Sequence, residues 1–308
     1  MNVETVPAML RTLPAAGRRR LLGVGLVLLS AVAFGSTSIF ARLAFAAGAD
    51  DITVLFIRFA IAAGVLLAIM AARRMPLPPW RVLLGLFLLG LIGRAGQGIT
   101  YFTALELAPA GLVAVLLYLY PALVTLLAWL FLKERLSAAK LAAVLVALAG
   151  TALAVGPTSG GRALGIALSL ITAVIAAVYI IASSRVTRHA TAFVSAAIIV
   201  AATALAYGGV ELVRGVILPR TPLGWAAIVA MALFSTVIGT VAFFAGLRRV
   251  GPTNASILSS FEPIWTVLLA ALVLGERLGP LQLAGGALIL AAVLALAREK
   301  PRPQPEAL

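Results

Sequence analysis

The chain has 308 residues and no cysteine; 63% of its residues are hydrophobic and only 11% are charged. So few charges could not cover a soluble protein of this size, which excludes a soluble globular domain, disulfides and thiolate chemistry. The formal net charge of +14 would suit a nucleic-acid partner, but the positions of the basic residues favour another explanation.

The apolar runs have the length that membrane helices require. A span needs about 20 apolar residues, and charge clusters, glycines and prolines divide the chain into ten such runs. The sequence therefore predicts an all-α integral membrane protein. A polar, proline-rich segment, 299–308, is predicted to be a disordered cytoplasmic tail. The predicted spans are 20–46, 51–72, 80–107, 109–132, 137–156, 162–184, 191–213, 222–247, 251–275 and 279–297.

Basic residues are distributed unequally between the two sides of these spans. The side of the N-terminal segment, 1–19, holds 17 of the 24 basic residues, the other side holds 4, and 3 lie inside spans. Positive charge collects on the cytoplasmic side of membrane proteins. We therefore expect cytoplasmic termini, a bacterial inner membrane as the partner surface, and no binding of nucleic acid.

The N-terminus allows one alternative interpretation. Arg18 to Arg20, the apolar run that follows and Ala31-Val32-Ala33 are similar to a cleavable signal peptide. The apolar run continues to Ala47, however, and cleavage would remove the repeat partner of the sixth span. A retained first span is the preferred interpretation.

The first two spans contain polar groups at several depths. The small residues 35–38 favour close helix packing over ligand contact. Asp50 and Asp51 are expected to cap the second span, because carboxylates favour helix N-termini. Arg58 lies about two turns into that span and must pair or contact water, since an unpaired charge there is costly.

The third span presents a polar face near the middle of the bilayer. Arg94, Gln97 and Tyr101 follow helical spacing and share that face. A guanidinium at this depth should face a wet cavity or an acidic partner. The alternative, an arginine held by backbone carbonyls without any ligand, stays open.

Two similar stretches, 119–136 and 261–278, indicate an internal duplication. Pro121 pairs with Pro263 and the Glu134-Arg135 pair with Glu276-Arg277, each at an offset of 142 residues. The predicted repeats are 20–156 and 162–298. Because each holds five spans, an odd number, the second enters the membrane inverted, a pattern typical of secondary transporters.

The paired prolines suggest paired hinges in the fourth and ninth spans. A proline inside a helix removes a backbone hydrogen bond and clashes with the preceding turn. Breaks at matching depth would let the two repeats bend together, although static kinks remain the alternative. Pro121 and Pro263 are the predicted gating residues.

Glu262 is the only carboxylate that the sequence places deep within a span. Four interpretations compete: binding of a substrate amine, proton carrying, an ion pair with Arg94 or Arg58, and a buried protonated acid. The Glu-Arg pairs at the span ends are expected to cap or anchor the following helices. The sequence contains no motif of a common membrane enzyme, so we expect no catalysis, cofactor or metal.

These features resemble the drug/metabolite transporter superfamily of the EamA type. The resemblance covers the whole chain and rests on the ten spans, the two repeats, Arg58-Phe59 and the repeated endings Lys133-Glu-Arg-Leu and Gly275-Glu-Arg-Leu. It implies a basket of spans one, three, four, six, eight and nine around a central cavity, and export of small metabolites by alternating access. Aromatic residues in those spans are similar to those expected of YddG-like amino-acid exporters.

The sequence thus predicts an exporter of amino acids with aromatic or other apolar side chains. Export of a nucleobase, sugar derivative or drug is the first alternative, and a non-transporting receptor or scaffold is the second. The substrate-binding residues are predicted to be Arg94, Gln97, Tyr101, Tyr118, Tyr179, Phe243, Glu262 and Trp265.

Overall fold

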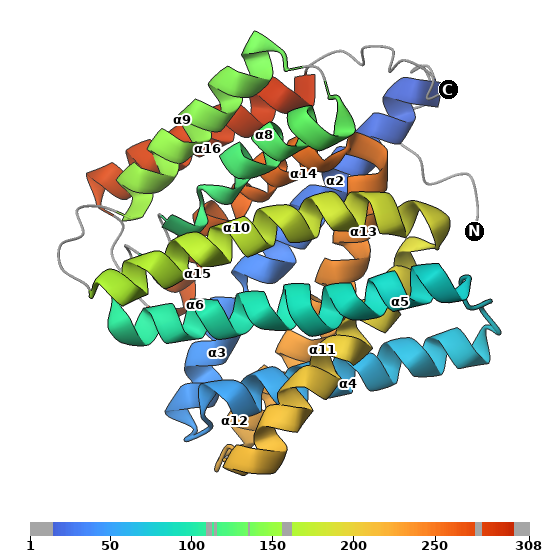
Figure 1. Cartoon of the computed structure of the whole chain (residues 1–308). Coiled ribbons are helices and arrows are strands. Elements are labelled where there is room, and N and C mark those ends of the chain that lie inside the picture. Colours follow the sequence, from blue (N-terminus) through green and yellow to red (C-terminus); the bar gives the residue numbers. More distant parts are fainter. Residues whose placement is uncertain are drawn as a thin grey trace, which may run out of the picture.

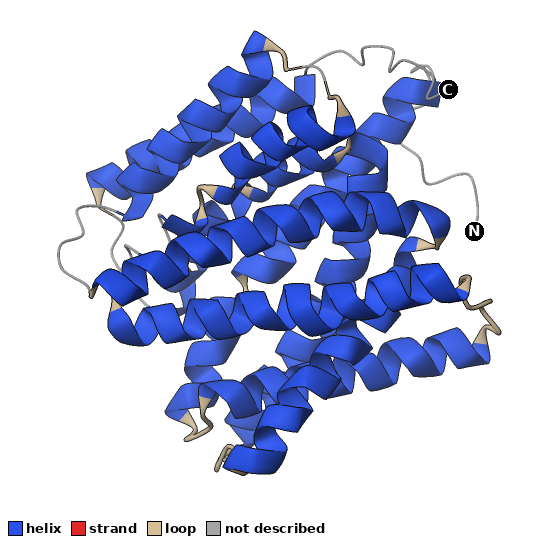
Figure 2. Cartoon of the chain, viewed as in Figure 1, coloured by secondary structure: helices blue, strands red, loops and turns tan. Residues whose placement is uncertain are grey.

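A computed structural model describes residues 15–108, 113, 116–134, 136–155, 162–274 and 279–298. These residues form helices and short connections, and none of them lies in a strand (Figure 2). The prediction of an all-α protein is therefore confirmed. The predicted tail 299–308, Arg135 and the Glu276-Arg277 pair lie outside the described residues.

Several helices agree closely with the predicted spans. The span predicted at 51–72 is α4, which has those bounds, and the span predicted at 80–107 is the continuous helix formed by α5, η2 and α6. Among the described residues, six helices are long and apolar enough to cross a membrane. In the first half the elements are α2 (Ala15–Gly35), α3 (Thr37–Ala46), α4 (Asp51–Ala72), α5 (Trp80–Leu88), η2 (Leu89–Arg94), α6 (Ala95–Leu107), α8 (Tyr120–Leu132) and α9 (Ala138–Val155).

The second half of the chain follows residue 162. The bounds of its last helix, α16 (Pro280–Arg298), differ from the prediction by one residue at each end. The other elements are α10 (Ala163–Val186), η3 (Thr187–His189), α11 (Ala192–Arg214), α12 (Pro222–Ala230), η4 (Met231–Ile238), α13 (Gly239–Val250), α14 (Pro252–Ser259) and α15 (Phe261–Leu274).

Side-chain caps fix several of the helix starts. The Asp50 carboxylate accepts a hydrogen bond from the Thr53 backbone N–H at 3.0 Å, and Asp51 accepts one from the Ile52 N–H at 2.8 Å. The predicted capping of the second span is thereby confirmed. Thr191 and Thr221 cap α11 and α12 in the same way.

Helices of the first half pack against helices of the second half. α2 packs on α13, and α10 packs on α6. α4 packs on α11, and α9 packs on α16. The helices α9 and α16 run side by side at the edge of the molecule (Figure 1). Each half therefore buries its apolar faces largely against the other half.

Two widened turns interrupt the long helices. η2 and η4 are π-helical segments that begin at Leu89 and Met231, 142 residues apart. In η2, Gly90 lets the backbone of α11 approach closely, because a Cβ there would lie 2.3 Å from the Ile199 carbonyl oxygen. Arg94 is the last residue of η2, so the widened turn sets the direction in which Arg94 points.

The prolines begin helices instead of breaking them. Pro121 lies in the first turn of α8 and Pro263 in the first turn of α15, just after breaks at 118–119 and at Ser260. The expectation of a hydrogen bond lost inside a helix is wrong, because a first-turn N–H has no intrahelical partner in any case. The breaks themselves do occupy matching positions in the two halves.

Gly90→Ala should destabilise the fold, because the added Cβ would meet the Ile199 carbonyl and the Ala202 Cβ at 2.3 and 2.7 Å. We expect a loss of about 1–3 kcal/mol in the free energy of unfolding, measured by thermal unfolding in detergent. Gly64→Ala is the matched control, because nothing lies within 4 Å of a Cβ at Gly64. Equal unfolding temperatures for the two variants would contradict the close approach.

Candidate functional site

Arg94 is the centre of the candidate site. Its Nη1 donates a hydrogen bond to the Gln97 Oε1 at 3.1 Å, as the predicted shared face requires. Its Cζ lies 5.9 Å from the centre of the Phe34 ring and 6.0 Å from that of Phe59. No described carboxylate lies within 4.0 Å of this guanidinium, so aromatic faces and an amide are its neighbours.

A second guanidinium lies beside the same ring. The Arg58 Cζ is 4.7 Å from the centre of the Phe59 ring, and its Nη1 donates to the Met231 Sδ at 3.3 Å. Arg58 is 8% exposed, and its Nε has no partner among the described residues. Among the described residues Arg58 therefore pairs with no acid, and its burial keeps it from bulk water; a thioether and a ring compensate its charge only weakly.

Aromatic rings continue the wall from Arg94 across the molecule. Phe34 lies 6.4 Å from Phe243, Phe243 lies 5.7 Å from Phe244, and Phe244 lies 6.5 Å from Tyr179, between ring centres. Tyr179 covers Gly93, one residue before Arg94, where a Cβ would come within 2.9 Å of the ring. The predicted residues Tyr179 and Phe243 thus belong to the same aromatic wall.

Glu262 and Trp265 lie on α15 where it packs on α2. The Trp265 Nε1 donates a hydrogen bond to the Ser36 Oγ at 2.9 Å, and a Cβ on Gly35 would lie 2.8 Å from the Glu262 carbonyl oxygen. The small residues of the first span therefore do permit close packing, as predicted. The indole of Trp265 is held in place by this bond.

The Glu262 carboxylate stands apart from the arginines. It is half-buried and has no hydrogen-bond partner among the described residues, and no ion pair joins it to Arg94 or Arg58. It does interact with Arg94 electrostatically through space. Of the four interpretations, a direct ion pair is therefore excluded for this conformation, and the acid is available to another partner.

Three tyrosines lie within electrostatic range of the acid. Tyr101, Tyr118 and Tyr120 all interact electrostatically with Glu262. The rings of Tyr118 and Tyr120 are 6.0 Å apart, while Tyr101 packs edge-on against Phe102 at 5.6 Å. The site therefore has a cationic part around Arg94 and an acidic part around Glu262.

Several residues near the site were not predicted from the sequence. No sequence pattern marked Phe34 or Tyr207, yet Phe34 covers Arg94, and the Tyr207 ring packs on Phe59 at 5.8 Å. Glu211 was also missed: it is 4% exposed, so Glu262 is not the only buried acid. Its place near the end of a predicted span, beside Arg214, gave no signal of burial.

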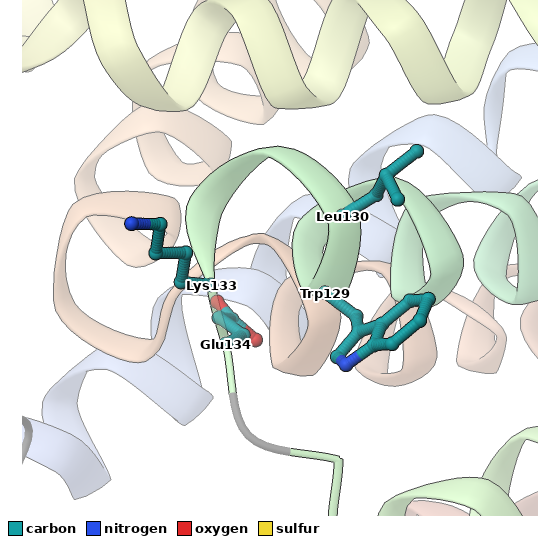
Figure 3. Close-up of a pocket in the computed structure, with 4 residues that line it drawn as sticks. All are labelled: Trp129, Leu130, Lys133 and Glu134. Atoms are coloured by element: carbon teal, nitrogen blue, oxygen red, sulfur yellow. The ribbon is translucent and has the colours of Figure 1, made fainter.

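A surface hollow lies elsewhere, at the end of α8. It is lined by Trp129, Leu130, Lys133 and Glu134, and the Lys133 side chain points away from the Trp129 ring (Figure 3). Glu134 pairs with Lys140 of α9 at 3.4 Å, which agrees with its predicted role as an anchor of the next helix. None of these residues belongs to the candidate site.

Comparisons with known proteins agree with a transporter. The profile of the EamA-like transporter family matches residues 21–156 and 163–298. The chain is 31% identical, over 68% of its length and 72% of the relative, to a protein of Ancylobacter novellus named aromatic amino acid exporter YddG. It is 30% identical, over 77% of its length and 79% of the relative, to the uncharacterized inner membrane transporter YedA of Escherichia coli K12.

A more distant relative and a solved structure extend the similarity along the chain. An uncharacterized transporter of Archaeoglobus fulgidus is 28% identical over 90% of this chain and 97% of its own. A protein of known crystal structure superposes with a TM-score of 0.75 over 89% of this chain and 95% of its own, at 24% identity. The latter similarity concerns the fold alone.

Arg58→Met should leave the free energy of unfolding unchanged or raise it by up to about 4 kcal/mol. The methionine side chain fills nearly the same space as that of arginine but buries no charge. Arg58→Ala should lower the free energy of unfolding by about 2–5 kcal/mol through the cavity it creates. Thermal unfolding in detergent measures both. If Arg58→Met destabilises the protein as much as Arg58→Ala does, the guanidinium itself stabilises the fold. The idea that Arg58 is kept for ligand binding at a cost in stability is then contradicted.

Proposed function

The chain belongs to the EamA-like transporter family, and on this basis we propose that it exports amino acids with aromatic or other apolar side chains across the bacterial inner membrane. The family and the named relatives are transporters and not enzymes. The relative named as an aromatic amino acid exporter supports this substrate class.

One observation carries the proposal: Arg94 has an amide and two rings as neighbours but no described carboxylate within 4.0 Å. A guanidinium so placed binds a carboxylate through a charge-assisted, bidentate hydrogen bond. In our proposal the substrate carboxylate binds Arg94 and the Gln97 amide. The apolar side chain of the substrate contacts the Phe34 and Phe59 rings.

The substrate ammonium binds on the acidic side of the site. Glu262 has no partner among the described side chains and interacts with Arg94 only through space. A zwitterion placed between the two would neutralise both charges, which lowers the cost of holding them in a membrane interior. The tyrosines around Glu262 would close the site on that side.

We propose that ten helices, arranged as two inverted five-helix repeats with cytoplasmic termini, alternate access to this site. The family profile matches 21–156 and 163–298, and the starts of these matches are separated by the same number of residues as the starts of the two π-helical segments. Helices of one half pack against helices of the other. Such repeats exchange inward and outward access by rocking around a fixed central site.

A second candidate substrate is an organic acid without an amine. The buried Arg58 favours it, because two guanidiniums lie beside the Phe59 ring and no described carboxylate lies within 4.0 Å of either. The site would then have an excess of positive charge. The two candidates differ in their dependence on Glu262. Glu262→Gln should weaken transport of phenylalanine but not of phenylpropionate if the amine is bound there.

Arg94→Gln should reduce transport of phenylalanine at least about tenfold, because one charge-assisted hydrogen bond contributes about 1.5–3 kcal/mol. Transport of phenylalanine amide, which lacks the carboxylate, should change far less. Uptake of both labelled compounds into proteoliposomes measures the difference. Equal losses for the two compounds, with wild-type amounts of folded protein, would show that Arg94 does not bind the carboxylate.

Pro121→Ala and Pro263→Ala should slow transport while leaving the unfolding temperature near that of the wild type. Alanine allows α8 and α15 to extend backward through the breaks at 118–119 and at Ser260, which would stiffen the proposed hinges. Substrate exchange in proteoliposomes and thermal unfolding test this. Wild-type exchange rates in both variants would leave the breaks as static features.

A further inference from the structure

Arg58 is a buried cation whose hydrogen-bonding capacity the protein does not use fully. Its side chain is 8% exposed, its Nη1 donates to the Met231 Sδ, and its Nε is buried without a partner among the described residues. A thioether is a weak acceptor, and a charged donor without an acceptor inside a protein is costly. A carboxylate matches a guanidinium far better, because it accepts two parallel hydrogen bonds from one edge of the group.

Arg58 and Arg94 lie at different depths along their helices. Arg58 is about two turns, or about 10 Å, from the start of α4 at Asp51. The sulfur that it contacts begins η4, about two and a half turns after the start of α12. Arg94 lies near the middle of the continuous helix formed by α5, η2 and α6. The starts of α4 and α12 face outward in the proposed topology, so Arg58 lies on the outer side of Arg94.

The Phe59 ring connects the two guanidiniums. Their Cζ atoms lie 4.7 and 6.0 Å from the centre of this one ring. Tyr207 of α11 holds the ring in place, because it packs on Phe59 at 5.8 Å while its hydroxyl donates to the Ala95 carbonyl at 3.3 Å. A carboxylate that leaves Arg94 therefore has a second guanidinium only one aromatic ring away.

An apolar cluster, which we call the outer plug, lies between Arg58 and the starts of α4 and α12. It is separate from the main core, and it includes the sulfur partner of Arg58. Its helices meet where α3 packs on α12 and α4 packs on η4. Separation at these contacts would uncover Arg58 and remove its sulfur partner in one movement. The buried members of the outer plug are Ala44, Ala49, Val54, Ile228 and Met231.

We propose that Arg58 is a second binding site for the substrate carboxylate, occupied after Arg94 and before release on the outer side. When the outer plug opens, the carboxylate passes along the Phe59 ring from Arg94 to Arg58 and replaces the Met231 sulfur as acceptor. The second guanidinium lowers the cost of moving an anion through the outer half of the protein. This inference rests on the proposed function for the direction of transport, whereas carboxylate binding at Arg58 is tested separately.

Access of a thiol reagent to the outer plug tests carboxylate binding without any measurement of transport. The chain has no cysteine, so Ile228→Cys introduces a single thiol at a plug position that is 0% exposed. The reagent is membrane-impermeant and is added outside right-side-out vesicles. Outer 3-phenylpropionate should accelerate labelling at least about threefold, because the anion binds Arg58 only in the opened state. The uncharged 3-phenylpropanamide should not accelerate it.

Two changes at Arg58 serve as controls for this labelling. Arg58→Met added to Ile228→Cys should abolish the acceleration, whereas Arg58→Lys, which keeps a cation, should retain part of it. Leu247→Cys should stay unlabelled, because this 2% exposed position lies at the opposite end of the same helix. Acceleration by both compounds, by neither, or equally in Arg58→Met would overturn the proposal. The comparison of the two compounds in Ile228→Cys alone decides the matter if Arg58→Met fails to fold.

The kinetics of export distinguish a release site from an entry site. In inside-out vesicles, Arg58→Met should lower the maximal rate of phenylalanine uptake at least about fivefold while KM stays within about twofold of the wild type. Arg58→Lys should restore part of the rate. Wild-type kinetics, or a raised KM with an unchanged maximal rate, would overturn the proposed order of binding. If the wild type transports no phenylalanine but its labelling responds to the carboxylate, the proposed substrate is wrong and the carboxylate site at Arg58 is supported.

Discussion

The structure depends on one constraint: a charge held inside a membrane protein must be compensated by the protein itself, because the bilayer interior supplies no water. Arg94 and Arg58 meet this constraint without an acid within 4.0 Å among the described residues. The Phe59 ring lies beside both, with Gln97 and the Met231 sulfur as further neighbours. This compensation is incomplete, which is the basis of the proposed binding of an anionic group on the cationic side of the site.

Much of the fold could be predicted because membrane thickness and caps act locally. The bounds of α4 and the caps by Asp50 and Asp51 follow from residues adjacent in sequence. The widened turns η2 and η4 could not be predicted, because a π-turn depends on contacts such as that of Gly90 with α11. The prolines were expected inside helices, whereas they lie in first turns just after breaks, which local sequence does not mark.

The site divides in the same way. The shared face of Arg94 and Gln97 followed from helical spacing, and the structure joins them by a hydrogen bond. Phe34 and Tyr207 contact Arg94 and Phe59, which lie on helices distant in sequence, so no local pattern marked them. Burial of Glu211 likewise results from the packing of α11 on α4 and from Thr53, 158 residues away.

The matching positions of the two widened turns have a practical consequence for mutational mapping. Because both halves carry the extra turn residue at the same point, starting at Leu89 and Met231, one numerical shift aligns them without a gap. Every substitution in one half therefore has a defined counterpart in the other. Comparing the two members of such a pair separates the effect of position within the half from the effect of the side chain that each half carries there.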